Sequence, residues 1–183
     1  MNIITAKEDF AKIRWFVMNA YKSENKAEEA LKSKGLQYFI PKCYAVRVYH
    51  GVKSKRLVPA IPNLVFVQAS KREIIDFKKV YGFLQFVMWV KSTGMEHLVV
   101  PDEQMENFIK IASRHEETTI YHKPGDIDIQ KGTRICIHGG QFDGVKGVFM
   151  RVRGKRSRRV VIMLEGVMAI SVEVNPDLIE IIA

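Results

Sequence analysis

The sequence has 183 residues, which is enough for one medium domain or two small ones, each with its own buried core. Hydrophobic residues make up 47% and charged residues 27%, a composition typical of a soluble globular protein that excludes disorder along the whole chain. The formal net charge of +9 favours an anionic partner: nucleic acid, an anionic membrane surface or an acidic protein.

The apolar runs are too short to predict a membrane-spanning helix. The most apolar window, residues 83–90 (FLQFVMWV), is far shorter than the roughly 20 residues that cross a bilayer, and it predicts a buried strand. No N-terminal segment combines a basic start with a long apolar run, so we expect no secretory signal and a cytoplasmic protein. Cys43 and Cys136 lie far apart and form no CxxC pair, which favours reduced thiols over a disulfide.

The predicted elements begin with an aromatic, β-prone segment. Residues 14–21 (RWFVMNAY) predict a central strand. Residues 25–35 (NKAEEALKSKG) place small and apolar side chains on one face at helical spacing and end in a glycine, so they predict a helix. Residues 38–51 (YFIPKCYAVRVYHG) and 61–67 (IPNLVFV) then predict two strands that pair with each other, joined by the basic connection 50–56 (HGVKSKR).

Two further helices complete the first half. A short helix at about residues 71–79 leads into the strand at 83–90. Residues 101–113 (PDEQMENFIKIAS) carry an apolar face at i, i+3, i+4 and i+7, formed by Met105, Phe108, Ile109 and Ala112. The order β-α-β-β-α-β-α predicts an α+β domain over residues 1–114, with helices packed on a mostly antiparallel sheet.

The pattern changes after this helix. Residues 115–125 (HEETTIYHKPG) show no sustained period and end in Pro-Gly, so we expect an exposed linker. From residue 126 to residue 183 the chain contains five short β-prone runs, at residues 133–139, 146–152, 159–164, 168–174 and 178–183. Short strands with tight turns predict a small β-barrel, because closing the sheet removes its exposed edges.

Four glycines lie between Arg134 and Met150, around the junction of the first two of these runs. Gly139 and Gly140 can adopt a positive φ at no steric cost, as a tight reversal requires. Gly147 lies inside the next strand, where a glycine indicates a close backbone neighbour or a kink. Phe142 stands between glycines on this turn, and its ring either folds back onto the core or projects as a binding knob.

A basic run follows at residues 151–159 (RVRGKRSRR). It holds six cations and no acid: Arg151, Arg153, Lys155, Arg156, Arg158 and Arg159. Gly154 suits the centre of a turn, so the run predicts a cationic hairpin tip. This tip is either a phosphate grip that gains affinity through counterion release, or a solvated turn that keeps a sheet edge from aggregating. The sequence leaves both interpretations open.

Several segments resemble one protein family. Residues 131–152 (KGTRICIHGGQFDGVKGVFMRV) resemble a KOW motif, and residues 169–182 (AISVEVNPDLIEII) resemble the end of the same barrel. Residues 15–35 (WFVMNAYKSENKAEEALKSKG) and 62–67 (PNLVFV) resemble an NGN domain. This order is the layout of the NusG family. The resemblance implies a ferredoxin-like NGN domain followed by a small SH3-like KOW barrel.

The resemblance also implies a function. In the NusG family the NGN domain binds the clamp helices of the largest RNA polymerase subunit through an apolar patch and suppresses pausing. The matching positions in this sequence are Trp15, Phe16, Ile61, Pro62, Asn63 and Leu64. Aromatic residues usually stand where Ile61 and Leu64 do, and core packing remains the alternative for Trp15.

Asn63 bears on the branch of the family. Housekeeping members have glycine at this position and RfaH-like paralogues have asparagine, so we expect a specialised RfaH- or UpxY-like paralogue that acts on particular operons. Lys22 and Lys26 match the region that RfaH uses on the non-template DNA strand, with solvated surface lysines as the alternative.

The KOW barrel of this family recruits either the termination factor Rho or the ribosomal protein NusE. The positions that match its contact turn are Gly140, Phe142 and Gly144, and Gln141 replaces a common proline. We therefore expect a monomeric elongation or antitermination factor, with DNA or RNA as a possible further partner and no membrane. The alternative is a ribosome- or RNA-binding KOW protein that does not act on polymerase.

Catalysis has little support in the sequence. The five histidines are scattered, and no H-x-x-x-H pair, clustered cysteines, P-loop or G-x-S-x-G motif accompanies them. We expect no enzyme activity, no metal and no cofactor.

Overall fold

The computed structural model describes residues 10–92, 94–152 and 158–182. The chain forms two compact units: unit 1 comprises residues 1–41 and 61–102, and unit 2 comprises residues 42–60 and 103–183. Each unit contains α-helical residues and antiparallel strands, so the fold class is α+β, as predicted. No helix in the described part of the chain is long and apolar enough to cross a membrane.

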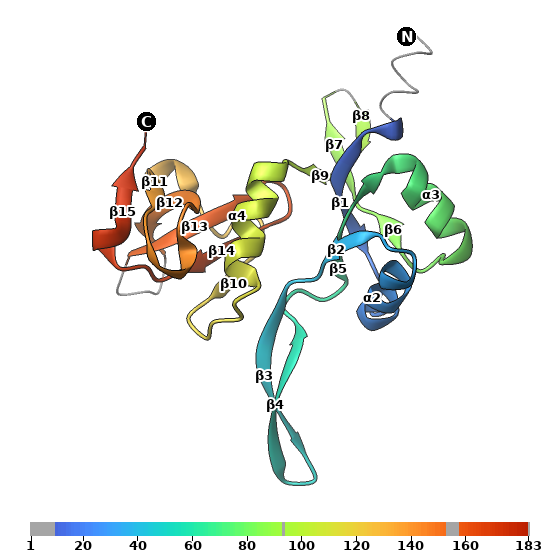
Figure 1. Cartoon of the computed structure of the whole chain (residues 1–183), viewed down its shortest axis with the longest axis horizontal. Coiled ribbons are helices and arrows are strands. Elements are labelled where there is room, and N and C mark those ends of the chain that lie inside the picture. The colour runs from blue at the N-terminus through green and yellow to red at the C-terminus, as the bar shows by residue number, and fades with distance from the viewer. Residues whose placement is uncertain (1–9, 93, 153–157, 183) are drawn as a thin grey trace. The chain divides into compact units, whose positions relative to one another are not determined.

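From residue 12 on, unit 1 comprises a main sheet, the helices α2 and α3 and a small hairpin (Figure 1). Its elements are β1 (Ile13–Asn19), α2 (Glu24–Ser33), β2 (Gln37–Phe39), β5 (Leu64–Ser70), α3 (Lys71–Val80), β6 (Gln85–Phe86), β7 (Met88–Lys91), β8 (Gly94–His97) and β9 (Val99–Val100). The sheet order is β2-β5-β1-β6, β9 also pairs with β1, and all these pairs are antiparallel. The predicted central strand is confirmed as β1.

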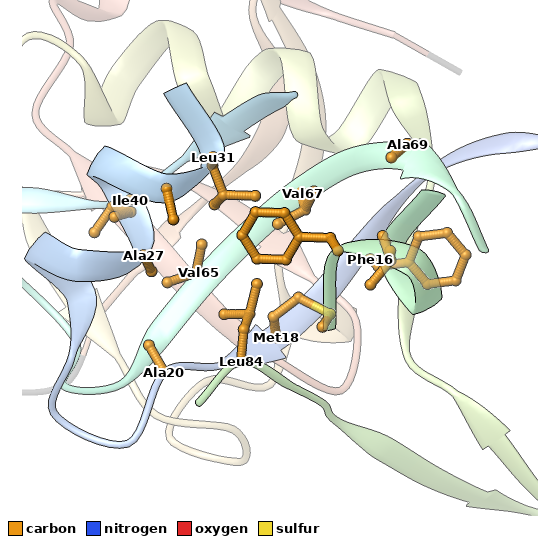
Figure 2. Close-up of a cluster of buried hydrophobic side chains, with 13 residues drawn as sticks. Phe16, Met18, Ala20, Ala27, Leu31, Ile40, Val65, Val67, Ala69 and Leu84 are labelled. Atoms are coloured by element: carbon orange, nitrogen blue, oxygen red, sulfur yellow. The ribbon is translucent and has the colours of Figure 1, made fainter. Parts of the chain in front are cut away.

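The core of unit 1 lies between the sheet and its helices. Alternate residues of a strand face opposite sides, so Phe16 and Met18 of β1 share a face with Val65 and Val67 of β5. Helices α2 and α3 bury their apolar stripes against this face, including Leu31 at 0% exposure. Figure 2 shows these side chains converging from strand and helix alike. The predicted helices at residues 25–35 and 71–79 are confirmed.

Helix α3 begins with a capping box. The Glu73 backbone N–H donates to Ser70 Oγ at 3.2 Å, and the Ser70 backbone N–H donates to Glu73 Oε2 at 2.8 Å. These reciprocal bonds satisfy amides that have no partner within the first helical turn. Hydrogen bonds from Ser70 also lower the pKa of the Glu73 carboxyl. The box fixes the point at which β5 turns into α3.

The predicted pairing of residues 38–51 with residues 61–67 holds only at its start, where Tyr38 and Phe39 of β2 lie opposite Val67 and Phe66 of β5. The first segment is divided near Pro41 into β2 and β3 (Lys42–Tyr49), since proline lacks an N–H donor and restricts the residue before it. Strand β3 pairs with β4 (Val52–Pro59), which includes most of the expected connection. His50 at φ 47° and Gly51 at φ 77° provide the left-handed backbone of the two-residue hairpin turn.

The apolar window at residues 83–90 is also not one buried strand. It divides into β6, which pairs with β1, and β7, which pairs with β8 in a separate hairpin. Leu84 is fully buried, but Val90 is 72% exposed. The apolar composition predicted that the whole window is buried. Burial is complete at Leu84, next to the strand β6 that joins the main sheet, whereas Val90 in the separate hairpin is exposed.

Unit 2 contains a six-stranded sheet, the β3–β4 hairpin and the third predicted helix, whose first residue lies at the unit boundary. Besides β3 and β4, its elements are α4 (Asp102–Ala112), β10 (Ile120–His122), β11 (Thr133–Ile137), β12 (Lys146–Arg151), β13 (Arg158–Leu164), β14 (Met168–Val172), β15 (Ile179–Ile181) and single 3₁₀ turns at Ile129–Lys131, Gly140–Phe142 and Pro176–Leu178. The sheet order is β10-β14-β13-β12-β11-β15, antiparallel throughout. The five predicted C-terminal strands are confirmed as β11–β15.

The sixth strand, β10, comes from the expected linker at residues 115–125. Its register places Tyr121 opposite Ile170 and His122 opposite Ala169, and His122 is 9% exposed. An exposed linker is therefore the wrong prediction for residues 120–122. The segment is too short to show a period of its own, and its partner strand β14 lies about 50 residues further along the chain.

The grouping of the chain differs from the expected division into residues 1–114, 115–125 and 126–183. Helix α4 belongs with the six-stranded sheet, because the Lys146 backbone N–H donates to Asn107 Oδ1 at 3.1 Å and Lys146 Nζ pairs with Glu103 at 2.9 Å. The hairpin belongs there too, because the Tyr121 hydroxyl donates to the Lys42 carbonyl at 3.3 Å. These bonds join segments whose association the sequence pattern cannot show.

Candidate nucleic-acid and partner interface

The turn before β5 and the loop after β1 form one surface in unit 1. The Lys22 backbone N–H donates to Asn63 Oδ1 at 2.5 Å, and the Ala20 backbone N–H donates to the Asn63 carbonyl at 2.8 Å. The Asn63 backbone N–H in turn donates to Glu24 Oε1 at 2.6 Å. We call Tyr21, Lys22, Lys26 and residues 61–64 the turn–loop surface. The structure thus brings together two groups of predicted contact residues from distant parts of the sequence.

This surface is built on unusual backbone. Three of its residues have left-handed φ angles: Tyr21 at 45°, Lys22 at 64° and Asn63 at 70°. Such conformations cost on the order of 1 kcal/mol each for residues with a Cβ, and they cluster at functional sites. The bonds to Asn63 hold the strained loop in place. The left-handed φ at position 63 also explains why asparagine stands there, because asparagine and glycine tolerate this conformation better than other residues.

The exposed part of the surface combines an aromatic ring, two cations and apolar groups. Tyr21 is 62% exposed. Lys22, Lys26 and Pro62 are exposed as well, and Ile61 and Leu64 are half-buried. Exposed aromatic rings stack on bases or fill apolar pockets of a partner, and lysines pair with phosphates. Tyr21 was missed by the sequence analysis, although an aromatic followed by lysine just after a strand was a usable signal.

Trp15 and Phe16 do not belong to this surface. Both are 3% exposed and lie in the middle of β1, opposite Gln68 and Val67 of β5. The Phe16 ring meets the Phe86 ring edge-on at 5.5 Å between centroids. Their predicted role as polymerase contacts is wrong for this structure, and the alternative of core packing holds. Aromatic residues in a central strand are buried on both faces here, which composition alone did not decide.

Replacing Asn63 separates its two roles. Asn63→Gly keeps the left-handed backbone and loses the bond to Lys22, so we expect about 1 kcal/mol less unfolding free energy. Asn63→Ala also loses that bond but keeps a Cβ at φ 70°, and alanine lacks the polar side chain that lets asparagine tolerate this conformation, so we expect about 2 kcal/mol. Urea denaturation of the three chains, followed by tryptophan fluorescence, measures both losses. An alanine variant as stable as the glycine variant would contradict the assigned backbone strain.

Among the described cations of the basic run at residues 151–159, two are exposed and one is buried. Arg151 and Arg158 are exposed and stand opposite each other in the β12–β13 register. The Arg158 guanidinium lies over the Phe149 ring, 5.9 Å from its centroid. Arg153, Lys155 and Arg156 lie outside the described residues. Two like charges placed side by side repel each other, so a bound phosphate between them would relieve this repulsion.

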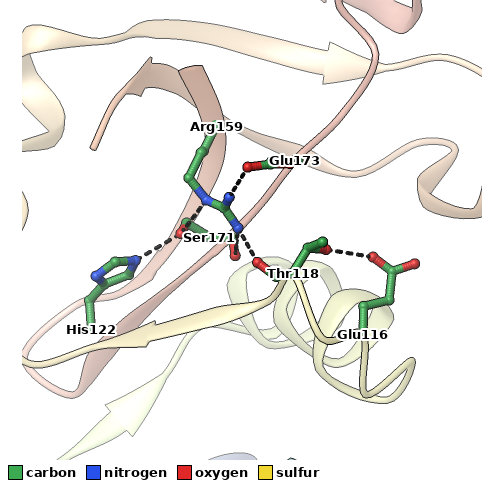
Figure 3. Close-up of polar contacts among 6 residues, drawn as sticks. All are labelled: Glu116, Thr118, His122, Arg159, Ser171 and Glu173. Carbon is green, nitrogen blue, oxygen red and sulfur yellow. Dashed lines mark hydrogen bonds and ion pairs between the residues drawn. The ribbon is translucent and has the colours of Figure 1, made fainter. Parts of the chain in front are cut away.

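Arg159 is not a surface cation, and its predicted nucleic-acid contact is wrong. It is 1% exposed. Its Nε donates to Ser171 Oγ at 3.0 Å, its Nη1 pairs with Glu173 at 2.7 Å, and its Nη2 donates to the carbonyls of Ser171 and Thr118 (Figure 3). Burial lowers the pKa of the guanidinium, while Glu173 acts in the opposite direction. Arg159 therefore joins β13, β14 and the segment before β10.

The glycine turn between β11 and β12 has the predicted backbone but not the predicted knob. Gly139, Gly140 and Gly144 have φ angles of 83°, 69° and 74°. The Gly139 backbone N–H donates to Asp143 Oδ1 at 2.6 Å, which closes the turn. Phe142 is 4% exposed, so its ring folds inward and the prediction of a projecting partner contact is wrong here. Gly140 and Gly144 themselves are exposed.

The remaining candidate chemistry is sparse. Cys43 and Cys136 are free thiols, each partly exposed. Within residues 10–92, 94–152 and 158–182, no group of three or more His, Cys, Asp or Glu side chains is placed to hold a metal ion. Three candidate binding surfaces come from the predicted residues: the turn–loop surface, the Arg151–Arg158 pair and the glycine turn.

Comparison with known proteins identifies the family. The NusG family model, described as transcription termination factor nusG, matches residues 13–109, which is more than half of the chain. The protein belongs to the NusG family. Members of this family are transcription factors that bind RNA polymerase, not enzymes. The matched span contains the whole turn–loop surface and the NGN-like elements of the fold.

A solved NusG structure has low similarity to the chain. The structure titled "Domain interaction in Thermotoga maritima NusG" is 20% identical, with 94% of this chain and 98% of that chain covered and a TM-score of 0.44. No curated protein sequence matches the chain.

Proposed function

We propose that the protein is a transcription elongation and antitermination factor, which acts as a monomer in the cytoplasm and binds RNA polymerase through the turn–loop surface. The main support for this proposal is that the NusG family match spans residues 13–109 and includes this surface. The contact is with the clamp helices of the largest polymerase subunit. A bound clamp stays closed over the nucleic acid, so pausing decreases.

The chemistry of the surface supports an apolar contact. Ile61 and Leu64 are half-buried and leave part of their side chains available to a partner. Tyr21, at 62% exposure, supplies the aromatic anchor that Ile61 and Leu64 lack. Because Asn63 holds the loop and the turn together, the surface is already ordered before it binds, which reduces the entropy cost of association.

A specialised role in the family is supported by Asn63 and the lysines beside it. Its side chain holds the loop that carries Lys22, a contact that a glycine at this position could not make. We propose that the protein is an RfaH- or UpxY-like paralogue and that Lys22 and Lys26, both exposed, contact the non-template DNA strand.

For unit 2 we propose an SH3-like KOW barrel formed by its six-stranded sheet. Its glycine turn recruits Rho or the ribosomal protein NusE. Since Phe142 is buried, we assign this contact to the exposed residues Gly140, Gln141 and Gly144. A second candidate function is ribosome or RNA binding without polymerase, and the exposed Arg151–Arg158 pair favours it.

Leu64→Glu tests the polymerase contact. A carboxylate on an apolar contact must lose its hydration shell when the partner binds, so we expect at least about tenfold weaker binding, or about 1.4 kcal/mol. The measurement is the affinity of the full chain for core RNA polymerase by fluorescence titration, with the melting temperature of each variant determined in parallel.

Val80→Glu is the matched control for this experiment. Val80 ends α3 in the same unit and is 68% exposed, but it lies outside the turn–loop surface. We expect its affinity to equal that of the unmodified chain. Equal affinity of the folded Leu64→Glu variant would place the polymerase contact elsewhere. Binding of RNA by a chain that does not bind polymerase would favour the second candidate function.

A further inference from the structure

The β3–β4 hairpin, residues 42–59, is a strongly basic two-stranded ribbon. It carries Lys42, Arg47, Lys53, Lys55 and Arg56. The whole chain has 20 acidic residues among 183, yet none falls within these 18 positions. Strands β3 and β4 form one continuous antiparallel pair from Lys42↔Pro59 to Tyr49↔Val52 (Figure 1). The ribbon therefore presents an uninterrupted positive potential to solvent.

The register places two arginines together on one face. Residues directly opposite each other share a face, and β3 pairs Arg47 with Ser54 and Ala45 with Arg56. Arg47 and Arg56 are thus diagonal neighbours on the same side, within reach of each other for long side chains. Both side chains are exposed. Neighbouring like charges cost stability, and an anion bound between them removes that cost.

The opposite face carries the lysines and an exposed apolar strip. Val46 is opposite Lys55 and Val48 is opposite Lys53, and the two valines are 65% and 64% exposed. Lys55 is engaged, because it pairs with Glu117 and lies 4.7 Å from the Tyr44 ring centroid. Lys53, Arg47 and Arg56 have no ion-pair partner among the described residues. These three exposed cations are available to a ligand.

Protection of a sheet edge does not account for this charge pattern. Charged side chains of either sign prevent the edge-to-edge pairing of exposed strands. A mixture of acidic and basic residues would therefore protect this ribbon equally well and leave it without net charge. Uniformly positive charge on both faces of a narrow ribbon instead fits a ligand that surrounds it with negative charge. The major groove of B-form DNA admits a two-stranded β-ribbon and is bordered by phosphates on both sides.

We propose that the β3–β4 ribbon is a binding site for double-stranded DNA, with Arg47, Lys53 and Arg56 as phosphate contacts. This site is distinct from Lys22 and Lys26 on the turn–loop surface and from the basic run at residues 151–159. A-form RNA is a poor fit, because its deep, narrow major groove does not admit such a ribbon. The inference does not depend on polymerase binding, since the ribbon contacts DNA directly.

A triple variant of the full chain, Arg47→Gln, Lys53→Gln and Arg56→Gln, tests the proposal. The affinity for a short fluorescein-labelled DNA duplex is measured by anisotropy across salt concentrations from about 50 to about 200 mM. Each lost phosphate contact reduces the slope of log affinity against log salt by about 0.9, so we expect the slope to fall by about 2 to 3. We also expect at least tenfold weaker binding at the lowest salt.

The matched control removes the same charge elsewhere: Lys12→Gln, Lys32→Gln and Lys34→Gln, all exposed positions of unit 1. We expect its salt slope to change by less than half as much. All six positions are exposed, so both variants should keep the melting temperature of the unmodified chain. An equal fall in slope in both variants, or an unchanged slope in the ribbon variant, would overturn the proposal. So would equal affinity of the unmodified chain for duplex RNA, with an equal loss on both duplexes in the ribbon variant.

An acidic protein is the other class of ligand for such a ribbon. It would leave DNA binding of the unmodified chain and the ribbon variant identical at every salt concentration, and this result would overturn the DNA proposal. Because no polymerase is present in the measurement, failure here leaves the proposed polymerase contact untouched. Failure of the Leu64→Glu experiment likewise leaves the DNA-binding result standing.

Discussion

Arg159→Met is expected to lower the unfolding free energy of unit 2 by about 3 kcal/mol. The substitution keeps the length and apolar character of the side-chain stem but removes every bond from the guanidinium. Two backbone carbonyls and Ser171 Oγ then each lose the hydrogen bond from Arg159, at about 1 kcal/mol for each buried group, although Ser171 Oγ keeps its contact with His122 Nε2 at 2.8 Å. Glu173 also loses its ion pair with Arg159, but it is half-exposed and water compensates for part of that loss.

Amide hydrogen exchange of β13 and β14 measures this effect, because exchange from core strands reports the opening free energy of the unit that contains them. Arg158→Met is the control. Arg158 is the preceding residue in β13 but is exposed, and we expect a change within about 0.5 kcal/mol. Similar protection in the two variants would show that the buried network contributes little to the stability of the sheet.

Gly147→Ala is expected to cost about 2 kcal/mol in the same unit. A Cβ at this position would lie 2.8 Å from the Val161 carbonyl oxygen and 2.9 Å from Val160 Cγ1, closer than real Cβ contacts. The carbonyl belongs to the backbone of the neighbouring strand, so the sheet itself must shift. This close approach confirms one of the two reasons expected for a glycine inside a strand.

Gly82→Ala is the control for that substitution. No atom lies within 4 Å of the position that its added methyl group would take, and its φ lies outside the left-handed range. We expect it to be neutral or slightly stabilising, because alanine restricts the unfolded chain more than glycine does. Thermal and urea denaturation compare the two variants with the unmodified chain. If Gly147→Ala were as stable as Gly82→Ala, the strand spacing at Val161 would be wider than described.

Elements with strong periodicity could be predicted from the sequence. Helices α2, α3 and α4 carry apolar faces at helical spacing, and the five C-terminal strands β11–β15 are apolar runs bounded by turn residues. Pairing between elements could not be predicted in the same way. Strand β10 has three residues, and the β3–β4 hairpin depends on a left-handed His50–Gly51 turn that no periodic pattern reveals.

In the candidate site, too, the residue types could be read from the sequence, but their burial and partners depend on strand pairing. Arg158 and Arg159 look equivalent in a basic run, yet one is exposed and the other buried, because adjacent residues of a strand point to opposite faces. The groups that satisfy Arg159 come from Thr118, Ser171 and Glu173, which the sequence places up to 41 residues away. Such partners become visible only when the strands are paired.

The turn–loop surface was only half predictable for the same reason. Residues 61–64 and Lys22 were identified separately by resemblance, but the bonds through Asn63 that join them span about 40 residues. Trp15 and Phe16 matched the same family patch and proved to be core residues of β1. Position in a family motif does not show which side chains reach the surface, whereas the paired strands do.

The lifetime of a paused RNA polymerase complex during in vitro transcription tests most directly whether the turn–loop surface binds polymerase. We predict that the full chain shortens the pause, that Leu64→Glu abolishes this effect, and that Val80→Glu retains it. A pause lifetime unaffected by the unmodified chain, or shortened equally by a folded Leu64→Glu variant, would contradict the claim that the turn–loop surface binds polymerase.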